Sequence, residues 1–319
     1  SFQPKLSPAG IEFFNRTVIN ARRLQAFAKE HEAGGAAATA LLAYLTRLQQ
    51  CIVSPALALG DTKAIQESTE LTDRAAREPS GALDALVEVV RKLRREGHDN
   101  VIVASNQTAP LMLAQSKLRR CVEDLGTTYV FHGGLTLAAR ARMTREFLGG
   151  ARGVLFLSVA AGGTGLHLVP GCLALVHFGP RSYSPAIELQ AEKRIHRLGQ
   201  TRPCTVVRVL DGVPSTDAAV PSDDPEAPEK EPEGGVGGAI GKGHSDKTRL
   251  ATCVLDGDDS GVGADGTYRF ALLGRIVDEL CYLDDCGNYS PSLTDDMVEE
   301  RLRARGGFSL DSHACMQAV

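Results

Sequence analysis

Tryptophan is absent from this 319-residue chain, and aromatic residues make up only 5% of it, although the hydrophobic content is an ordinary 43%. No apolar run approaches the roughly 20 residues that a membrane-spanning helix needs. The first residues also lack the features of a secretory signal peptide. We therefore expect a globular protein that is neither secreted nor bound to a membrane. Because the chain begins with Ser1 rather than methionine, we also expect a piece of a longer protein.

None of the eight cysteines forms a C-x-x-C pair, which is the spacing most typical of zinc or redox sites. Reduced, mostly buried thiols of an intracellular protein are the simplest interpretation. The group Cys281, Cys286, His313 and Cys315 is too irregularly spaced for a zinc template. The sequence therefore predicts no metal site.

The chain also lacks a convincing loop for holding the phosphates of ATP. Residues 237–243 are rich in glycine and include Lys242, but Gly243 stands where a serine or threonine would hold magnesium. Residues 276–279 (Ile-Val-Asp-Glu) resemble an acidic magnesium-binding strand, yet their neighbours repeat with helical spacing. We interpret both segments as structural.

Charge is distributed unevenly along the chain. Residues 80–210 carry 17 lysine and arginine residues against 9 acidic ones, a net charge of +8, which leaves −12 for the remainder of a chain whose net charge is −4. A basic domain with acidic flanks is typical of a module that binds a polyanion.

The pattern of residues 80–210 predicts a parallel α/β sheet with helices on both faces. Apolar strands over 101–104, 129–131, 153–158, 173–178 and 204–210 alternate with helices over 81–96, 110–118, 136–148 and 185–198. Ligands of such sheets bind at the carboxyl ends of the strands. The turns at 105–107 and 158–165 and the helix from Pro185 should therefore meet at one edge.

The flanking segments have other patterns. Residues 1–60 read as helices with apolar positions at helical spacing, and residues 61–79 read as a polar loop. Residues 211–249 contain an acidic, proline-rich stretch and then a glycine-rich one, which predicts a disordered insertion. Residues 250–319 return to helical periodicity over 268–283 and 294–304.

The segment 185–200 is the most informative stretch. On a helix, Ile187, Ala191, Ile195 and Leu198 form a core-facing stripe, while Gln190, Arg194 and Arg197 form a polar stripe beside it. Arginine offers a planar set of donors that matches phosphate oxygens, so the pair suits a polyphosphate. A solvated basic face is the alternative for this helix taken alone.

This segment is similar to the last helicase motif of the Swi/Snf family of superfamily-two DNA translocases. The matching pattern is Gln-Ala-x-x-Arg-x-x-Arg-x-Gly-Gln, from Gln190 to Gln200. Ser158 and the glycines at 162, 163 and 165 resemble the family's fifth motif, and residues 42–57 resemble its leucine-rich connection between lobes. This chain departs from the family's pattern at Lys193, His167 and Tyr183-Ser184.

The resemblance implies a RecA-like lobe of the P-loop NTPase type, the second of two, with helical flanking segments. In the family a brace helix usually follows the last strand directly, and here we expect it over residues 268–283, displaced beyond the insertion. In the family, one of the two motif arginines contacts ATP on the opposite lobe, so Arg194 and Arg197 become candidate catalytic residues. Candidates for nucleotide binding are Gln190, Gly163, Gly165 and Gln200, and candidates for contacting the DNA backbone are Ser105, Gln107, Arg140, Ser158 and Thr164.

ATP and Mg²⁺ would be held mainly by the first RecA-like lobe, and double-stranded DNA would be the main partner. Nucleosomes or replication and repair proteins are further expected partners, in a nuclear or viral intracellular setting. By itself the chain should not hydrolyse ATP. The competing hypothesis is a degenerate lobe that binds DNA or protein without catalysis.

Overall fold

A six-stranded sheet forms the centre of the part of the chain that the computed structural model describes, which covers residues 4–31, 34–60, 62–159, 168, 171–197, 199–210, 213–218, 240 and 266–305. The strand order is β2-β3-β1-β4-β5-β6. The first five in chain order are parallel, and β6 pairs antiparallel to β5. Their bounds are β1 Asn100–Ser105, β2 Thr127–Phe131, β3 Gly153–Ser158, β4 Ala174–Phe178, β5 Thr205–Leu210 and β6 Val213–Ala218. The predicted parallel α/β sheet is confirmed.

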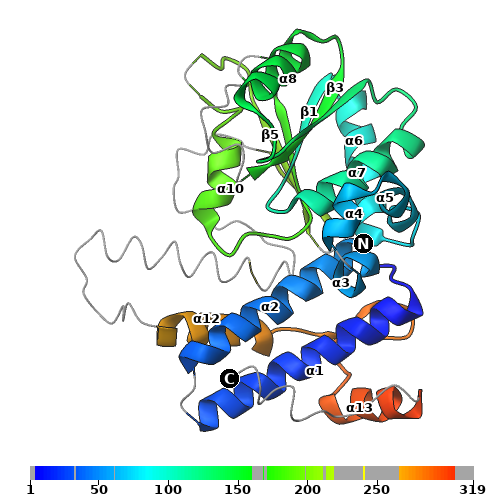
Figure 1. Cartoon of the computed structure of the whole chain (residues 1–319), viewed down its shortest axis with the longest axis vertical. Coiled ribbons are helices and arrows are strands. Elements are labelled where there is room, and N and C mark those ends of the chain that lie inside the picture. Colours follow the sequence, from blue (N-terminus) through cyan, green and yellow to red (C-terminus); the bar gives the residue numbers. More distant parts are fainter. Residues whose placement is uncertain are drawn as a thin grey trace, which may run out of the picture.

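Helices cover both faces of this sheet (Figure 1). Alternate residues of β1 divide between two cores: Val101 and Val103 pack with α6 (Gly81–Arg95) and α7 (Thr108–Cys121), whereas Ile102 and Ala104 face the other side. There they meet the apolar residues of α8 (Leu137–Gly149) and α10 (Pro185–Glu192). Burial on both faces explains why the central strands are apolar without alternation.

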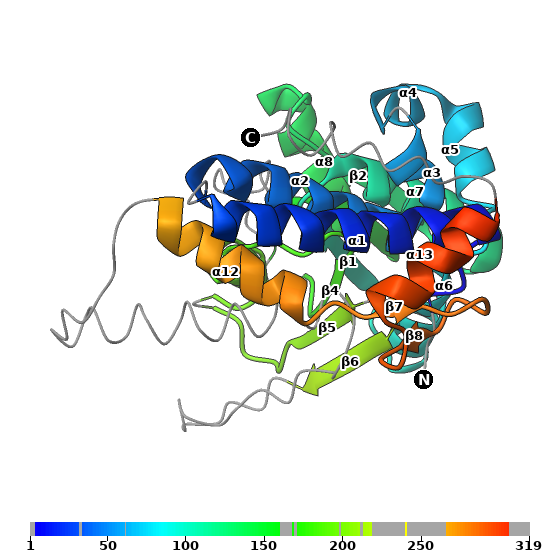
Figure 2. The same ribbon diagram turned by 90° about the horizontal axis from the view of Figure 1, so that it is seen from below.

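A layer of helices lies beneath the sheet and joins the two ends of the described chain (Figures 1 and 2). It contains α1 (Pro8–Glu30), α2 (Gly34–Val53), α12 (Gly266–Asp278), α13 (Asp295–Ala304) and a small hairpin of β7 (Tyr282–Leu283) and β8 (Tyr289–Ser290). One hydrophobic cluster runs through all of these helices and the hairpin. The segments predicted separately at residues 1–60 and 250–319 therefore share a core.

Polar contacts fix the C-terminal elements on α1. The side chain of Asn15 donates to Leu283 O and accepts from Leu283 N, both at 2.8 Å. Gln25 donates to Gly274 O at 3.1 Å, and Arg22 pairs with Asp295 at 2.5 Å. The sequence predicted the helix at 294–304, but the helix predicted at 268–283 ends at Asp278, because residues 282–283 form β7. The assignment of α12 as the family's displaced brace helix stays a prediction.

One other prediction on the connections is wrong, and a second differs from the structure in the few residues of it that are described. Residues 61–79 are not a loop throughout, since α4 (Thr62–Glu67) and α5 (Thr69–Ala75) are helices that pack near α7. Their apolar content is low, and Ser116 of α7 holds this segment by donating to Asp73 at 2.6 Å. Strand β6 falls within the insertion predicted over 211–249 and completes the sheet edge beside β5. Apart from Ile240, the rest of that insertion lies outside the described residues.

The structure also includes α3 (Pro55–Leu59), which follows α2 after a break at Ser54. Among the helices described, none is both long enough and apolar enough to cross a lipid bilayer.

Asn15→Ala should lower the free energy of unfolding by about 2 kcal/mol, because it leaves the buried backbone N–H and C=O of Leu283 without partners. Urea denaturation followed by circular dichroism measures this change. Asn20→Ala, on the same helix and half-buried, is the control and should change stability by no more than about 0.5 kcal/mol. Equal effects of the two substitutions would contradict the assigned role of Asn15.

Candidate functional site

The carboxyl ends of β1, β3 and β4 form the edge at which the site is expected. Ser105 and Ser158 occupy matching positions on β1 and β3, and both are buried. The sequence thus brought these two candidates together correctly. The glycine-rich turn after β3, with Gly163, Thr164, Gly165 and His167, lies outside the described residues.

Helix α10 begins as predicted but is shorter than predicted. Ser184 precedes Pro185 at its start, and the helix ends at Glu192, with Lys193 as its C-cap. The chain then continues in tight turns: Arg194 N donates to Ala191 O, and both Ile195 N and His196 N donate to Glu192 O. Gly199 has φ +96°, the left-handed conformation expected of a stop. Arg194 and Arg197 therefore lie on a turn that follows the helix.

The predicted core stripe is correct at two positions and wrong at one. Ala191 and Ile195 are buried among the apolar residues of the sheet. Ile187 is 38% exposed, and its neighbour Glu188 is buried instead. The helix is rotated so that Glu188 can meet arginines of the sheet region, which an apolar periodicity does not reveal. Leu198, the fourth predicted position, lies outside the described residues.

The two motif arginines lie in different environments. Arg194 is largely buried, and its pKa is lowered from the ordinary value first by burial and then by the nearby charge of Arg197. Arg197 is half-buried, and its Nε donates to Lys193 O at 3.0 Å. Two cations that repel one another are stabilised by an anion placed between or beside them. That this turn binds an anion stays a prediction.

The two glutamines of this motif also lie in different environments. Gln190 is exposed on α10, where it is accessible to a ligand. Gln200 is occupied within its own turn, since its Nε2 donates to Ile195 O at 3.3 Å and its Oε1 accepts from Arg202 N at 3.4 Å. The structure thus gives Gln200 a role in shaping the turn.

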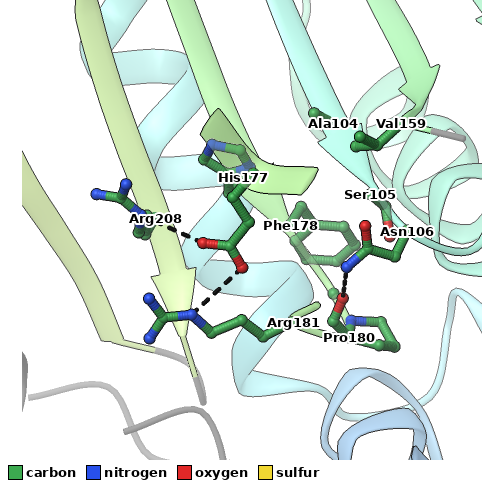
Figure 3. A pocket seen from close by; sticks show the side chains of 11 residues that line it. Ala104, Ser105, Asn106, Val159, His177, Phe178, Pro180, Arg181 and Arg208 are labelled. Atoms are coloured by element: carbon green, nitrogen blue, oxygen red, sulfur yellow. Dashed lines mark hydrogen bonds and ion pairs between the residues drawn. The ribbon is translucent and has the colours of Figure 1, made fainter. Parts of the chain in front are cut away.

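A largely buried network of charged residues fixes α10 to the sheet, and the sequence reading missed it. Figure 3 shows the part of this network that contains His177, Arg181 and Arg208. Glu188 pairs with Arg181 at 3.3 Å and with Arg208 at 3.8 Å. Glu192 accepts from Arg208 at 2.7 Å and from His177 at 3.1 Å. The two carboxylates lie one turn apart on α10, while His177 lies on β4 and Arg208 on β5. The sequence signal for this network is the spacing of Glu188 and Glu192, which places both on one face of a helix, together with Arg208 in the strand that follows.

Burial alone would raise the pKa of Glu192, but the hydrogen bond from His177 and the charges of His177, Arg208 and Arg181 outweigh it and lower the pKa. Glu192 is therefore ionised in the folded protein. Because Glu192 is also the last residue of α10, this network fixes the point at which the chain leaves the helix. We call the segment that follows, which carries Arg194 and Arg197, the arginine turn.

Those candidates for contacting DNA that the structure describes lie along the same edge. Gln107 follows β1 as the residue before α7, and its Oε1 accepts from Gln50 of α2 at 2.8 Å. Arg140 lies on α8, beyond the carboxyl end of β2, with its guanidinium 5.5 Å from the centre of the Phe131 ring. It also donates to Gly133 O at 2.8 Å. The aromatic stack and this bond hold Arg140 at the far end of the edge.

Residues that could hold a metal do not cluster in the described part of the chain. His313 and Cys315, two of the four zinc candidates considered above, lie outside that part. Within the described residues, the carboxylates nearest the arginine turn, Glu188 and Glu192, are paired with arginines.

The arrangement is that of a RecA-like lobe in which the arginine turn follows a helix bonded to His177 of β4 and Arg208 of β5. Residues 81–199 match the family described as helicase conserved C-terminal domain. This part of the chain is therefore a helicase conserved C-terminal domain, the kind of lobe that the motif resemblance indicated.

Similar curated proteins come from yeasts. The DNA repair and recombination protein RDH54 of Saccharomyces cerevisiae is 29% identical over 176 residues, which cover 53% of this chain and 18% of that protein. The DNA repair protein RAD5 of Candida albicans is 33% identical over 136 residues, which cover 41% of this chain and 12% of that protein. The chain thus spans less than a fifth of the length of these relatives.

The fold has a counterpart among solved structures. The Sulfolobus solfataricus SWI2/SNF2 ATPase core in complex with dsDNA aligns with a TM-score of 0.53 and 18% identity, covering 80% of this chain and 45% of that one. The likeness is one of fold.

Glu192→Gln should destabilise the protein at neutral pH by roughly 1–3 kcal/mol, the range for hydrogen bonds to charged groups. The folded-state pKa of Glu192 lies below the ordinary 4.5, so its contribution is complete above pH 4.5 and is lost as pH falls through the folded value. Urea denaturation between pH 7 and pH 3 should show the two proteins converging in acid. Glu146→Gln, exposed on α8, is the control, and a pH-independent gap for Glu192→Gln would contradict this account.

Proposed function

We propose that this chain is the second motor lobe of an ATP-dependent translocase on double-stranded DNA. The observation that carries the proposal is the pair Arg194 and Arg197, which follows a helix fixed at the carboxyl edge of a helicase-type sheet. Arginines placed at a phosphoryl group stabilise the charge of the transition state. The exposed Gln190 would contact the same ligand.

ATP with Mg²⁺, held mainly by a first RecA-like lobe, would supply the phosphoryl group that is transferred to water. The part of this lobe is to bring Arg194 and Arg197 to the β- and γ-phosphates when the two lobes close. Arg197, the more exposed of the two, is suited to reach across the cleft, and Arg194 is suited to holding the turn and adding charge behind it.

Contacts with DNA would be made along the edge formed by Ser105, Gln107, Ser158 and Arg140, together with Thr164 of the glycine-rich turn. Amides, hydroxyls and a guanidinium are groups that bind phosphate oxygens without reading bases. Gly163 and Gly165 would let the backbone approach the nucleotide closely. Since the relatives are named as DNA repair proteins, we propose that the longer protein works on chromosomal or viral DNA, with nucleosomes or replication and repair proteins as partners.

The alternative is a non-catalytic lobe that binds DNA or protein. Tyr183 favours this reading to a degree, because it takes the place of a family tryptophan and is inward-facing: burial raises its pKa to about 12, and its hydroxyl accepts from Gln49 at 3.0 Å. Lys193, exposed where the family usually has aspartate, is the second such departure.

Arg197→Ala, made in a protein that joins this lobe to its ATP-binding lobe, should reduce DNA-stimulated ATP hydrolysis by about 10³-fold or more. The reason is the loss of a cation that acts on the transition state. A coupled phosphate-release assay measures the rate. Arg95→Ala, exposed at the end of α6 near the opposite edge of the sheet, is the matched control and should leave the rate unchanged. Unchanged hydrolysis by Arg197→Ala would support the non-catalytic alternative.

The 319-residue chain should bind duplex DNA with little sequence preference and with an affinity that falls steeply as salt rises, because phosphate contacts release counterions. Arg140→Ala should reduce the slope of log Kd against log salt by about 1, as expected for one lost phosphate contact. Fluorescence anisotropy with two duplexes of unrelated sequence gives these slopes. Arg95→Ala should keep the wild-type slope, and no binding at low salt would refute the DNA assignment.

A further inference from the structure

Two adjacent glutamines at the end of α2 reach two different loops of the ligand-binding edge. Gln49 Nε2 donates to the hydroxyl of Tyr183 at 3.0 Å, and Gln49 Oε1 accepts from the backbone N–H of Arg181. Gln50 Nε2 donates to Gln107 Oε1 at 2.8 Å. One turn of a single helix therefore holds both the loop that leads into α10 and the residue that precedes α7.

The two loops are also bonded to one another. Asn106 Nδ2, in the loop after β1, donates to Pro180 O at 3.2 Å in the loop after β4 (Figure 3). Hydrogen bonds therefore run from Gln107 through α2 to Arg181, and directly from Asn106 to Pro180. The segment 179–184 continues into α10, which ends at the arginine turn.

Helix α2 is a rigid support for these contacts. Leu45, Leu48 and Cys51 of α2 are fully buried in the core of the helical layer, so the helix cannot rotate without opening that core. Gln49 is itself 5% exposed, and both polar atoms of its amide are bonded. A buried amide satisfied at both ends fixes the position of its partners as well as its own.

Gln50 sets the orientation of the amide of Gln107. Because the amino group of Gln50 donates to the carbonyl oxygen of Gln107, the amino group of Gln107 is left to donate elsewhere. A phosphate oxygen accepts hydrogen bonds and donates none. The contact thus presents Gln107 in the orientation that suits DNA.

We infer that Gln49 and Gln50 are positioning residues that couple a DNA contact at Gln107 to the arginine turn, through the loop 179–184 and α10. This inference rests on the proposed function, since it takes Gln107 to contact DNA and the turn to contact ATP. A phosphate bound by Gln107 restrains Gln50 and Asn106, and through α2 and Pro180 restrains the loop before α10. DNA binding at one loop thereby orders the other.

Hydrogen–deuterium exchange on the 319-residue chain tests this coupling without needing hydrolysis. With a saturating 20-base-pair duplex at low salt, exchange should slow at residues 105–108, where DNA is contacted. It should also slow by at least about fivefold at residues 179–192, the lower end of usual couplings between sites. Gln49→Leu should reduce the second protection and keep the first, because it removes both bonds from α2 to the loop 179–184 and leaves the bond from Asn106 to Pro180.

Three further variants make the outcome specific. Gln49→Glu should retain protection of 179–192, since a carboxylate accepts from Arg181 N and from the Tyr183 hydroxyl. Gln115→Leu removes a side-chain hydrogen bond to Thr128 on the outer part of α7 and should behave as the wild type. Gln50→Leu should weaken DNA binding by about threefold or more, the equivalent of about one hydrogen bond. It should also reduce both protections, because the amide of Gln107 is no longer held in its orientation.

The outcomes separate the two proposals. Protection of 105–108 without protection of 179–192 in the wild type, or equal protection of 179–192 in Gln49→Leu, overturns the coupling and leaves the DNA assignment intact. Absence of any protection by duplex DNA refutes the DNA assignment itself. If Gln49→Leu speeds exchange throughout the sheet, this variant has lost its fold, and the other two glutamine variants decide. Loss of the 179–192 protection in Gln49→Glu overturns the coupling. Full retention of the 179–192 protection in Gln50→Leu also overturns it.

Discussion

The buried charge network beneath α10 is the constraint on which the candidate site depends. Glu188 and Glu192 meet Arg181, Arg208 and His177 in a part of the protein where ionised groups are costly unless they are paired. The pairing fixes the rotation of α10 and therefore where the chain leaves the helix. Arg194 and Arg197 follow Glu192 by two and five residues, so the paired carboxylates of α10 set the position of the turn that carries these arginines.

The helical layer gives this edge a second fixed point. Helices from both ends of the described chain share one core, and α2 crosses from that core to the loops after β1 and β4. The segments at 1–60 and 266–305 are thus more than connections on either side of a helicase lobe. They form the support against which the loops of the lobe are held, and a change in the layer would reach the site through α2.

Apolar periodicity was sufficient for the sheet, because strands buried on both faces leave a clear signal at 101–104 and 153–158, and the motif around Arg194 identified the class of lobe. Features that depend on polar contacts between distant residues could not be predicted from apolar periodicity. The exposure of Ile187 follows from Glu188 pairing with residues far away in sequence, and the helices at 62–75 have little apolar content of their own. Strand β6 was missed because its place beside β5 depends on a sheet edge rather than on its sequence. The glycine-rich turn, with Gly163 and Gly165, lies outside the residues the structure describes, so its role stays a prediction.

The central claim is that Arg194 and Arg197 act on a nucleotide held by another lobe, and differential binding measures it most directly. A protein containing both lobes would be titrated with ADP and with ADP–aluminium fluoride, a mimic of the phosphoryl-transfer transition state, with and without the double substitution of both arginines by alanine. The account predicts that the substitution weakens binding of the mimic by at least about 10²-fold while changing ADP affinity little, since catalytic groups favour the transition state. Equal loss for both ligands, or no loss for either, would contradict it.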